Sequence, residues 1–260
     1  MLAPILRGIL DFCFPWTCAV CKNGFERPAA GRSLCATCEA ELAKLEGEPA
    51  CAACATSLPM HRSPCPYCMG KGPTNYERVA RLAAFHEPLR AMIHHLKYHR
   101  RWGMGEELAE RLAKSSGANE VLKDADVLVP VPLHWRRQIP RGYNQAEVVA
   151  RHLGRLVKVP VSRAVKRVIN TEQQTRLHSP AKRAENLRDA FRLVKAELVT
   201  GRRVVVVDDV WTTGATMQAV ARAIKAGKPK SLSAIVVART DPRGVKPVAE
   251  RPVEEVELDP

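Results

Sequence analysis

The segment from Val204 to Thr216, with the sequence VVVVDDVWTTGAT, constrains the fold more than any other part of this 260-residue chain. Its four consecutive valines predict a strand that is buried on both faces, as in the middle of a parallel sheet. Two acids, Asp208 and Asp209, follow the valines, and a Thr/Gly turn then leads into a helical pattern. This order predicts an α/β domain in which the N-terminus of a helix can bind an anion.

The turn after the two acids has the residue types of a phosphate-binding loop. The candidate ligands are Thr212, Thr213, Gly214, Ala215 and Thr216. Their amides and the threonine hydroxyls can surround one phosphate, and the glycine lets the backbone approach it closely. Carboxylates would repel a phosphate, so we expect Asp208 and Asp209 to accept hydrogen bonds from sugar hydroxyls, while Mg²⁺ shields a nearby pyrophosphate. The sequence contains no Walker A loop, G-x-x-x-x-G-K-[ST].

The neighbouring segments predict further strands and helices. Apolar runs at 127–133 and 232–238 indicate two strands, and residues 217–224 have one apolar helical face. Asn144 is expected to begin another helix, with Glu147 as its capping-box partner. Strands and helices that alternate at these lengths predict a parallel central sheet with helices on both faces.

Residues 1–75 contain all nine cysteines, and eight of them form four C-x-x-C pairs. These are Cys18 and Cys21, Cys35 and Cys38, Cys51 and Cys54, and Cys65 and Cys68. Two such pairs supply four thiolates in a tetrahedron, so the pattern predicts two structural zinc ions. Sequential pairing is the simplest arrangement, and an interleaved pairing stays open. A disulfide framework is disfavoured because nothing signals secretion, and a redox pair would not recur four times. The ninth, Cys13, is expected to be a buried apolar residue.

The chain is strongly basic, with 41 Lys and Arg against 27 acids and a formal net charge of +14. The stretch 134–203 alone has 17 basic and 5 acidic residues. Such clustering favours a polyanion site for the phosphates of a small ligand or for nucleic acid. Aromatic residues make up only 5 %, which leaves little material for base stacking.

Three arginines, Arg136, Arg137 and Arg141, follow the end of the 127–133 strand. We expect them to face the same crevice as the two acids and to bind a pyrophosphate bidentately, although an exposed basic loop is the alternative. The polar segment 170–186 is either a lid over the ligand or an ordinary surface loop. Histidines 94, 95 and 99 are expected to be surface residues.

Neither end of the chain predicts a membrane anchor. Residues 1–16 have the spacing of one amphipathic helix, which we expect to dock on the protein itself. No run of about 18 apolar residues occurs, so no stable membrane insertion is expected. The absence of a signal-peptide pattern indicates a cytoplasmic protein. The end of the chain, 241–260, is acidic and rich in proline, which is typical of a disordered tail.

Residues 204–216 resemble the motif by which type I phosphoribosyltransferases bind phosphoribosyl diphosphate (PRPP). Segments 129–145 and 167–191 resemble those of the ComF family (competence protein F). The resemblance implies a type I phosphoribosyltransferase fold at 76–240, preceded by a helix and a double zinc ribbon at 1–75. It also implies that Asp208 and Asp209 bind the ribose 2′ and 3′ hydroxyls, and that residues 212–216 bind the 5′-phosphate. Thr212 replaces the aspartate of enzymes that act on 6-oxopurines, which argues against a guanine or hypoxanthine substrate.

The ComF resemblance implies a PRPP-binding protein of DNA uptake, natural transformation or DNA use. Its expected partners are single-stranded DNA and the machinery of DNA uptake or a helicase. The alternative is an active phosphoribosyltransferase that transfers phosphoribosyl from PRPP to an amine or a base. Function depends on the site rather than on the fold, so the sequence leaves both hypotheses open.

Overall fold

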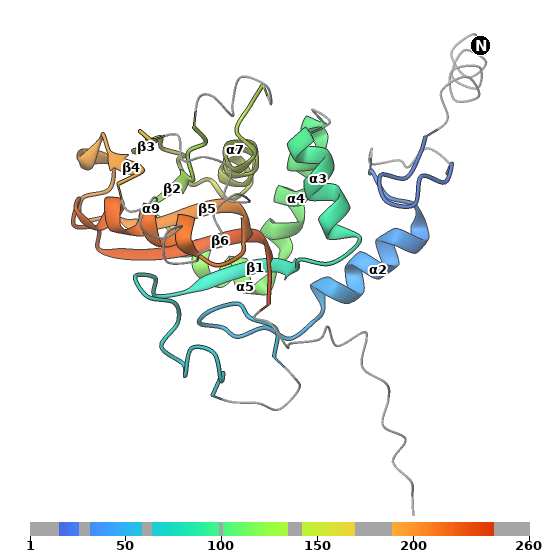
Figure 1. The fold of residues 1–260 in the computed structure, drawn as a ribbon, viewed down its shortest axis with the longest axis horizontal. Helices are drawn as coiled ribbons and strands as arrows, with labels where there is room; N and C mark the ends of the chain where they lie inside the picture. Colours follow the sequence, from blue (N-terminus) through green and yellow to red (C-terminus); the bar gives the residue numbers. More distant parts are fainter. Residues whose placement is uncertain are drawn as a thin grey trace, which may run out of the picture.

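The computed structural model describes residues 16–25, 32–58, 64–98, 101–134, 142–169 and 189–241. Its centre is a four-stranded sheet in the order β1-β6-β5-β2, and all three strand pairs are parallel (Figure 1). The strands are β1 (Val79–Ala84), β2 (Val127–Pro130), β5 (Arg203–Trp211) and β6 (Ser231–Arg239). The predicted parallel central sheet is therefore confirmed.

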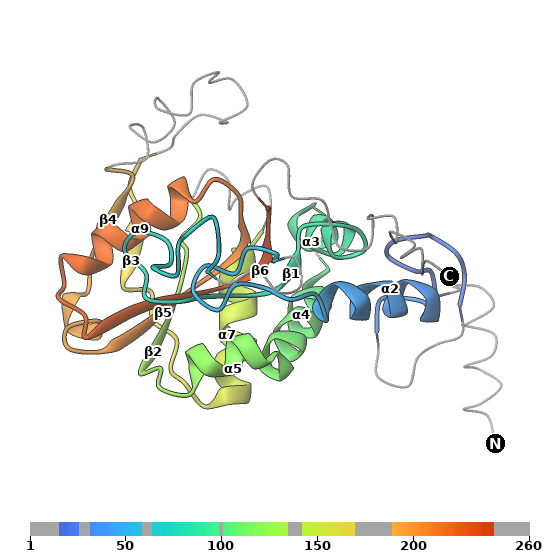
Figure 2. The same cartoon turned by 90° about the horizontal axis from the view of Figure 1, so that it is seen from below.

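The described α-helices lie before β1 and between the strands of the central sheet in the sequence. They are α2 (Ala36–Glu46), α3 (Leu89–Tyr98), α4 (Trp102–Lys114), α5 (Ser116–Leu122), α7 (Gln145–Val157) and α9 (Ala215–Lys225). Figure 2 shows α9 on one side of the sheet and α4, α5 and α7 on the other. The two-stranded antiparallel ribbon of β3 (Val165–Arg167) and β4 (Phe191–Leu193) lies on the side of α9, and the 3₁₀ turn η2 (Ala196–Leu198) follows it.

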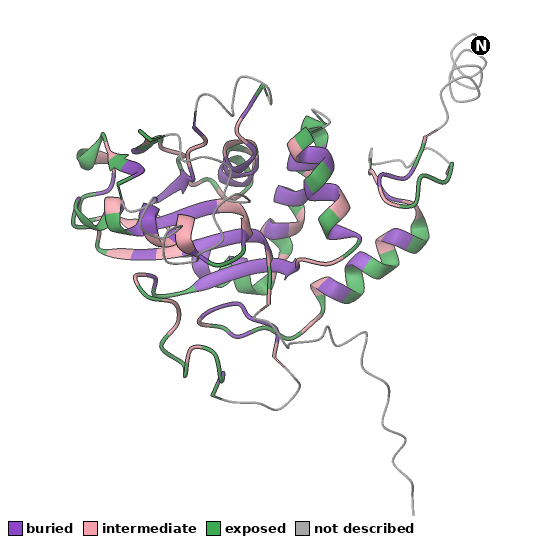
Figure 3. Cartoon of the chain, in the orientation of Figure 1, coloured by how far each residue is buried: buried purple, intermediate pink, exposed green. Residues whose placement is uncertain are grey.

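The run of valines in β5 divides between two hydrophobic cores because successive side chains of a strand point to opposite faces. Val205 and Val207 pack in one core with side chains of α3, α4, α5 and α7. Val204 and Val206 pack in the other with Met217, Val220 and further residues of α9. Figure 3 shows the strands as the most buried layer of the molecule. An all-valine strand therefore fits a sheet that is covered on both faces.

Helix α7 begins where the sequence predicts, but its first turn differs in one detail. The side chain of Asn144 accepts a hydrogen bond from the amide of Ala146 and so caps the helix. Glu147 does not act as the capping-box partner, because its carboxylate instead accepts hydrogen bonds from Arg151 and Arg163. Two cations therefore compete for this carboxylate more effectively than the backbone amide does.

The first two cysteine pairs and α2 dock onto the helices of the α/β domain. Leu42 and Leu45 of α2 share a hydrophobic core with Leu108 and Leu112 of α4. His95 of α3 is buried, contrary to the expectation of a surface residue, and its Nε2 lies 2.8 Å from the carbonyl oxygen of Ala19. His94 is exposed as expected.

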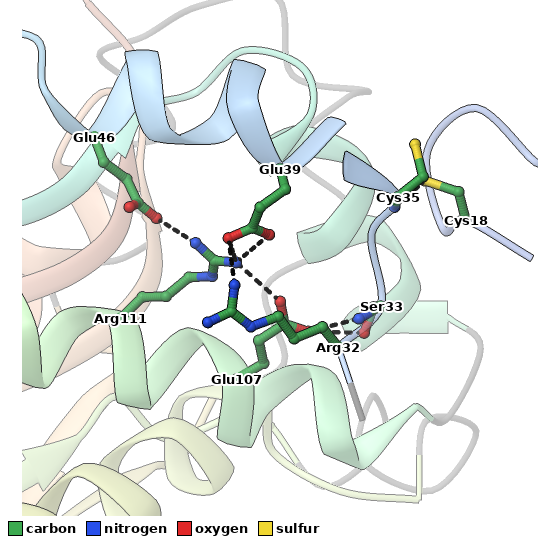
Figure 4. Close-up of polar contacts among 8 residues, drawn as sticks. All are labelled: Cys18, Arg32, Ser33, Cys35, Glu39, Glu46, Glu107 and Arg111. Carbon is green, nitrogen blue, oxygen red and sulfur yellow. Dashed lines mark hydrogen bonds and ion pairs between the residues drawn. The ribbon is translucent and has the colours of Figure 1, made fainter. Parts of the chain in front are cut away.

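Arg111 of α4 forms the polar centre of this interface (Figure 4). Its guanidinium forms ion pairs with Glu39 at 2.6 Å, Glu46 at 3.0 Å and Glu107 at 3.2 Å. Glu107 in turn accepts hydrogen bonds from the backbone and hydroxyl of Ser33. Arg111 is only 12 % exposed, so these pairs are shielded from water.

We expect Arg111→Ala to lower the free energy of unfolding by about 3 kcal/mol, because Glu46 and Glu107, which are only partly exposed, lose their ion pair. Arg32→Ala is a matched control. Arg32 also pairs with Glu39, but it is 50 % exposed, so its loss should cost less than about 1 kcal/mol. Urea denaturation of both variants measures the difference. Equal effects of the two substitutions would show that Arg111 does not hold the interface.

Several predicted features lie outside the described residues. They are the helix at 1–15, Cys13, residue 99, Arg136, Arg137, Arg141, the candidate lid at 170–186 and the tail from 242 onward. Among the helices in the described ranges, none is long and apolar enough to cross a membrane.

Candidate ligand cleft and metal centres

A cleft of about 300 Å³ lies at the carboxyl ends of the parallel strands. Parallel α/β sheets bind ligands at this end because strand ends and helix N-termini converge there. The cleft is lined from α3 by Lys97, from β5 by Asp208 and Asp209, from the following loop by Thr212 and from the first turn of α9 by Thr216. The structure therefore brings the two acids and the candidate phosphate loop into one hollow.

The loop between β5 and α9 depends on Gly214. This residue is the N-cap of α9 and has a φ of 80°, in the left-handed region that favours glycine. A Cβ atom at this position would lie 2.7 Å from Nε1 of the buried Trp211. No side chain caps α9, and Thr212 and Thr213 are exposed. The first amides of the helix and two hydroxyls are thus available to an anion.

The two acids differ in their surroundings. The pKa of Asp208 is raised to about 8, mainly by burial and next by the negative charge of Asp209, while the amide of Asp209, Lys97 and Arg167 act in the opposite direction. Asp209 forms an ion pair with Lys97 at 3.1 Å, and its side chain is 14 % exposed. The cleft therefore keeps one carboxyl that is protonated near neutral pH beside one that pairs with an ammonium group.

Three further side chains line the cleft, and none of them was predicted from the sequence as a ligand-site residue. Lys97 comes from α3, Arg167 comes from β3 and packs over the ring of Phe191 at 5.4 Å, and Asn144 caps α7. Asn144 also donates a hydrogen bond of 2.9 Å to the carbonyl oxygen of Val131, which fixes the chain after β2. In the sequence, the segment Leu96-Lys97-Tyr98 resembles the ComF family, but no role for Lys97 follows from that resemblance.

Aromatic and basic side chains pack against the loop between β5 and α9. The rings of Tyr76 and Trp211 meet edge to face at 5.6 Å, and the guanidinium of Arg239 lies 5.0 Å from the Trp211 ring. The Tyr76 hydroxyl donates a hydrogen bond of 2.8 Å to the carbonyl oxygen of Met217 in α9. These contacts hold Trp211 against Gly214, so the shape of the loop is determined by packing beneath it.

The eight paired cysteines form two groups of four, and the pairing is sequential. Cys18, Cys21, Cys35 and Cys38 make the first group, and Cys51, Cys54, Cys65 and Cys68 make the second. Within each group all sulfur atoms lie within 4.8 Å of one another. The closest sulfur pairs, at 3.7 to 3.8 Å, match the edge of about 3.8 Å that a zinc–sulfur tetrahedron requires. Both groups therefore fit a structural zinc ion.

The second group is docked along the edge of the sheet. The amide of Val79 in β1 donates to the carbonyl oxygen of Ala53, between the first two cysteines of the group. Arg81 of β1 is buried and bonds both to Ser57 and to Asp241, which follows β6. The metal module is thus attached to β1 and to the end of β6.

We expect two zinc ions per chain when the protein is purified without chelators and analysed for metal. We also expect Cys35→Ser to lose one ion and to lower the melting temperature of the α/β domain, because Cys18 and Cys38 belong to the same core cluster as α4. A folded, metal-free protein would exclude both zinc sites.

Comparison with known proteins agrees with this architecture. A family model described as a double zinc ribbon domain matches residues 9–69, and one described as a phosphoribosyl transferase domain matches residues 140–257. Competence protein F of Haemophilus influenzae is 30 % identical over 217 residues, which cover 82 % of this chain and 92 % of that protein. The chain belongs to the competence protein F family. The fold predicted from the sequence, a phosphoribosyltransferase domain preceded by a double zinc ribbon, is thereby confirmed.

Two further relatives show how far this family extends. The DNA utilization protein YhgH of Escherichia coli K12 is 33 % identical over 80 % of this chain and 90 % of that protein. Competence protein ComFC of Bacillus subtilis 168 is 34 % identical over 44 % of this chain and 45 % of that protein. The first two relatives are thus similar to this chain over about four-fifths of its length.

Proposed function

We propose that this chain is a PRPP-binding ComF-type protein that acts in DNA uptake or DNA use in the cytoplasm and binds single-stranded DNA. The observation that carries the proposal is the cleft itself. Asp208 and Asp209 end a buried strand, and the loop at 212–216 lines the same hollow with a glycine in the left-handed conformation. PRPP is a ribose with a phosphate at one end and a diphosphate at the other. Its sugar hydroxyls match the two carboxyl groups, and its 5′-phosphate matches the loop.

Each part of the cleft has a role in the proposal. Asp208 and Asp209 accept hydrogen bonds from the ribose 2′ and 3′ hydroxyls, and residues 212–216 bind the 5′-phosphate. Lys97 pairs with Asp209 and is placed to offset negative charge when Mg²⁺ and PRPP enter. Arg136, Arg137 and Arg141 bind the pyrophosphate. The residues that flank this arginine segment, Leu133 and Asn144, both line the cleft, which supports their assignment.

The DNA part of the proposal rests on the relatives and on charge. Two of the similar proteins are named for competence and one for DNA utilization. The net charge of +14 exceeds what a single PRPP molecule needs. We propose a DNA-uptake machine or a helicase as the partner; the names of the relatives refer to competence and DNA utilization.

An active phosphoribosyltransferase is the second candidate. The match of residues 140–257 to a phosphoribosyl transferase domain favours it. In that reaction an amine or base would form a bond to C1′ of the ribose as the bond to pyrophosphate breaks. Release of pyrophosphate from PRPP in the presence of an acceptor separates this candidate from a protein that only binds.

Isothermal titration with PRPP tests the proposal. We expect one molecule to bind per chain, more tightly with Mg²⁺ than without it, and ribose 5-phosphate to bind more weakly because it lacks the diphosphate. A DNA-binding assay with a labelled single strand at low salt tests the second part. Absence of PRPP binding at millimolar concentration would refute the assignment of the cleft.

A further inference from the structure

A second hollow, of about 810 Å³, lies at the amino end of β6, whereas the ligand cleft lies at the carboxyl ends of the strands. It is formed by the segment before β1, which contains Tyr67 to Glu77, and by the segment between α9 and β6. The amide of Glu77 donates to the carbonyl oxygen of Leu232, so these two segments are in contact. Because β5 and β6 are parallel, the amino end of β6 lies far from the carboxyl end of β5, where Asp208 and Asp209 lie. Figure 1 shows the segment before β1 beside the amino end of β6.

Four lysines line this hollow, and we call them the lysine cluster: Lys71, Lys225, Lys228 and Lys230. All four are exposed, and none forms an ion pair with another described residue. Glu77 is the one acidic residue in the lining. In the sequence, positions 210–240 contain five basic residues and no acid. Lys225 donates a hydrogen bond to Asn75, and the charge of Lys230 helps to lower the pKa of Asp126. Neither contact is an ion pair, so the like charges of the cluster favour an anion as their complement.

The second cysteine group reduces this charge only in part. Cys68 lines the hollow, and a zinc ion with four thiolates has a charge of −2. Burial lowers the pKa of the nearby Arg239, while the charges of Cys54, Asp241, Cys51 and Cys65 raise it. The four lysines and Glu77 in the lining sum to +3, so the hollow stays positive beside the zinc site.

Exposed apolar side chains lie beside the lysines. Tyr67 is 45 % exposed and Met69 is 64 % exposed, and both belong to the lining. A cationic groove with an exposed aromatic ring is the pattern by which proteins bind single-stranded nucleic acid, since lysines contact phosphates and the ring stacks on a base. An acidic protein would use the lysines but would have no need of the tyrosine ring.

We propose that the lysine cluster binds the sugar-phosphate backbone of a single-stranded nucleic acid, with Tyr67 stacked on one base. This inference rests on the proposed DNA function of the chain. It places the DNA-binding site at the amino end of β6, away from the PRPP cleft at the carboxyl ends of the strands. It also differs from the expectation that residues 134–203 hold the polyanion. In that stretch Arg151 and Arg163 share Glu147, and Arg203 pairs with Asp126.

Two matched triple variants test the proposal. Lys225→Gln/Lys228→Gln/Lys230→Gln removes three charges from the cluster. Lys158→Gln/Lys166→Gln/Lys195→Gln removes three exposed charges elsewhere, and each set contains one lysine with a positive φ, Lys228 or Lys158. The probe is a fluorescent oligothymidine, and its affinity is measured by anisotropy over a range of salt concentrations. Each phosphate contact contributes about 0.7 to the salt slope of a single strand. The cluster variant should therefore lose about two units of slope, and the control should lose much less.

Substitutions of Tyr67 test the stacking. Tyr67→Ala should weaken binding about fivefold or more, whereas Tyr67→Phe should keep most of the affinity. Zinc content and thermal unfolding of each variant confirm that the module stays folded. Titration with PRPP should be unaffected by the cluster variant, and Asp208→Asn/Asp209→Asn should still bind DNA.

The outcomes separate this inference from the proposed function. If wild-type protein binds the oligonucleotide and both triple variants weaken it equally, the lysine cluster is not the site and the DNA function stands. If only the cluster variant loses slope but Tyr67→Ala has no effect, the stacking part is wrong. Failure of the wild-type protein to bind any single strand at low salt would contradict both.

Discussion

The double substitution Asp208→Asn/Asp209→Asn is expected to weaken PRPP binding by about a hundredfold or more. A hydrogen bond to a charged group contributes about 1.5–3 kcal/mol, and 1.4 kcal/mol corresponds to a factor of ten in affinity. Each asparagine keeps the size of the side chain but cannot become the carboxylate that accepts a hydrogen bond from a ribose hydroxyl. Calorimetric titration measures the loss, and unchanged affinity would remove both acids from the site.

The single substitution Asp208→Asn should stabilise the fold, although it weakens PRPP binding. Because burial raises the pKa of Asp208 from 3.8 to about 8, the folded protein holds a proton that the unfolded chain releases. The contribution of Asp208 to wild-type stability should therefore fall as the pH rises from about 4 to about 8. Asp208→Asn removes this titration, so it should raise the melting temperature at pH 7 and more so at pH 8.

Asp126→Asn is the matched control for this pH dependence. Hydrogen bonds from Arg203 lower the pKa of Asp126 to about 2, so its carboxylate stabilises the fold above about pH 4 and stops doing so as the pH falls toward 2. Its substitution should lower the melting temperature at pH 7. If Asp208→Asn also lowered the melting temperature at pH 7, Asp208 would stabilise the fold. Its buried carboxyl would then not be a cost kept for ligand binding.

Gly214→Ala is expected to reduce PRPP affinity about tenfold or more and to destabilise the fold. A left-handed conformation costs a residue with a Cβ about 1–2 kcal/mol. The new Cβ would also meet the indole of Trp211 at 2.7 Å, so the loop has to shift away from the position that binds the phosphate.

Two companion variants separate strain from collision. Gly201 also has a positive φ, of 67°, but a Cβ there meets nothing within 4 Å. Gly201→Ala should therefore cost stability alone and leave PRPP affinity unchanged. Adding Trp211→Phe to Gly214→Ala should restore part of the affinity, since the smaller ring relieves the contact. Equal affinity of the Gly214→Ala and wild-type proteins would show that the loop does not hold the phosphate.

The sequence predicted those features that depend on local pattern. The valines of β5, the asparagine cap of α7 and the four cysteine pairs each form from residues close together in the chain. Lys97 and Arg167 escaped assignment because they come from α3 and β3, which only the folded topology brings to Asp208 and Asp209. The interface around Arg111 escaped for the same reason, since Glu39 and Arg111 are far apart in sequence.

The two groups of cysteines illustrate the same limit. Spacing shows that pairs exist, but identical C-x-x-C turns do not specify their partners, and only the sulfur positions give the sequential arrangement. The charge of residues 134–203 could be counted but not located. Counting charges does not reveal which of them, such as Arg151 and Arg163, already pair with an acid of the same protein.

The measurement that tests the central claim most directly is a crystal structure of the protein with PRPP and Mg²⁺. We predict the ribose hydroxyls within hydrogen-bond reach of Asp208 and Asp209, and the 5′-phosphate at the amides of residues 213–216. PRPP bound at another place, or no PRPP in the cleft at a saturating concentration, would contradict the account.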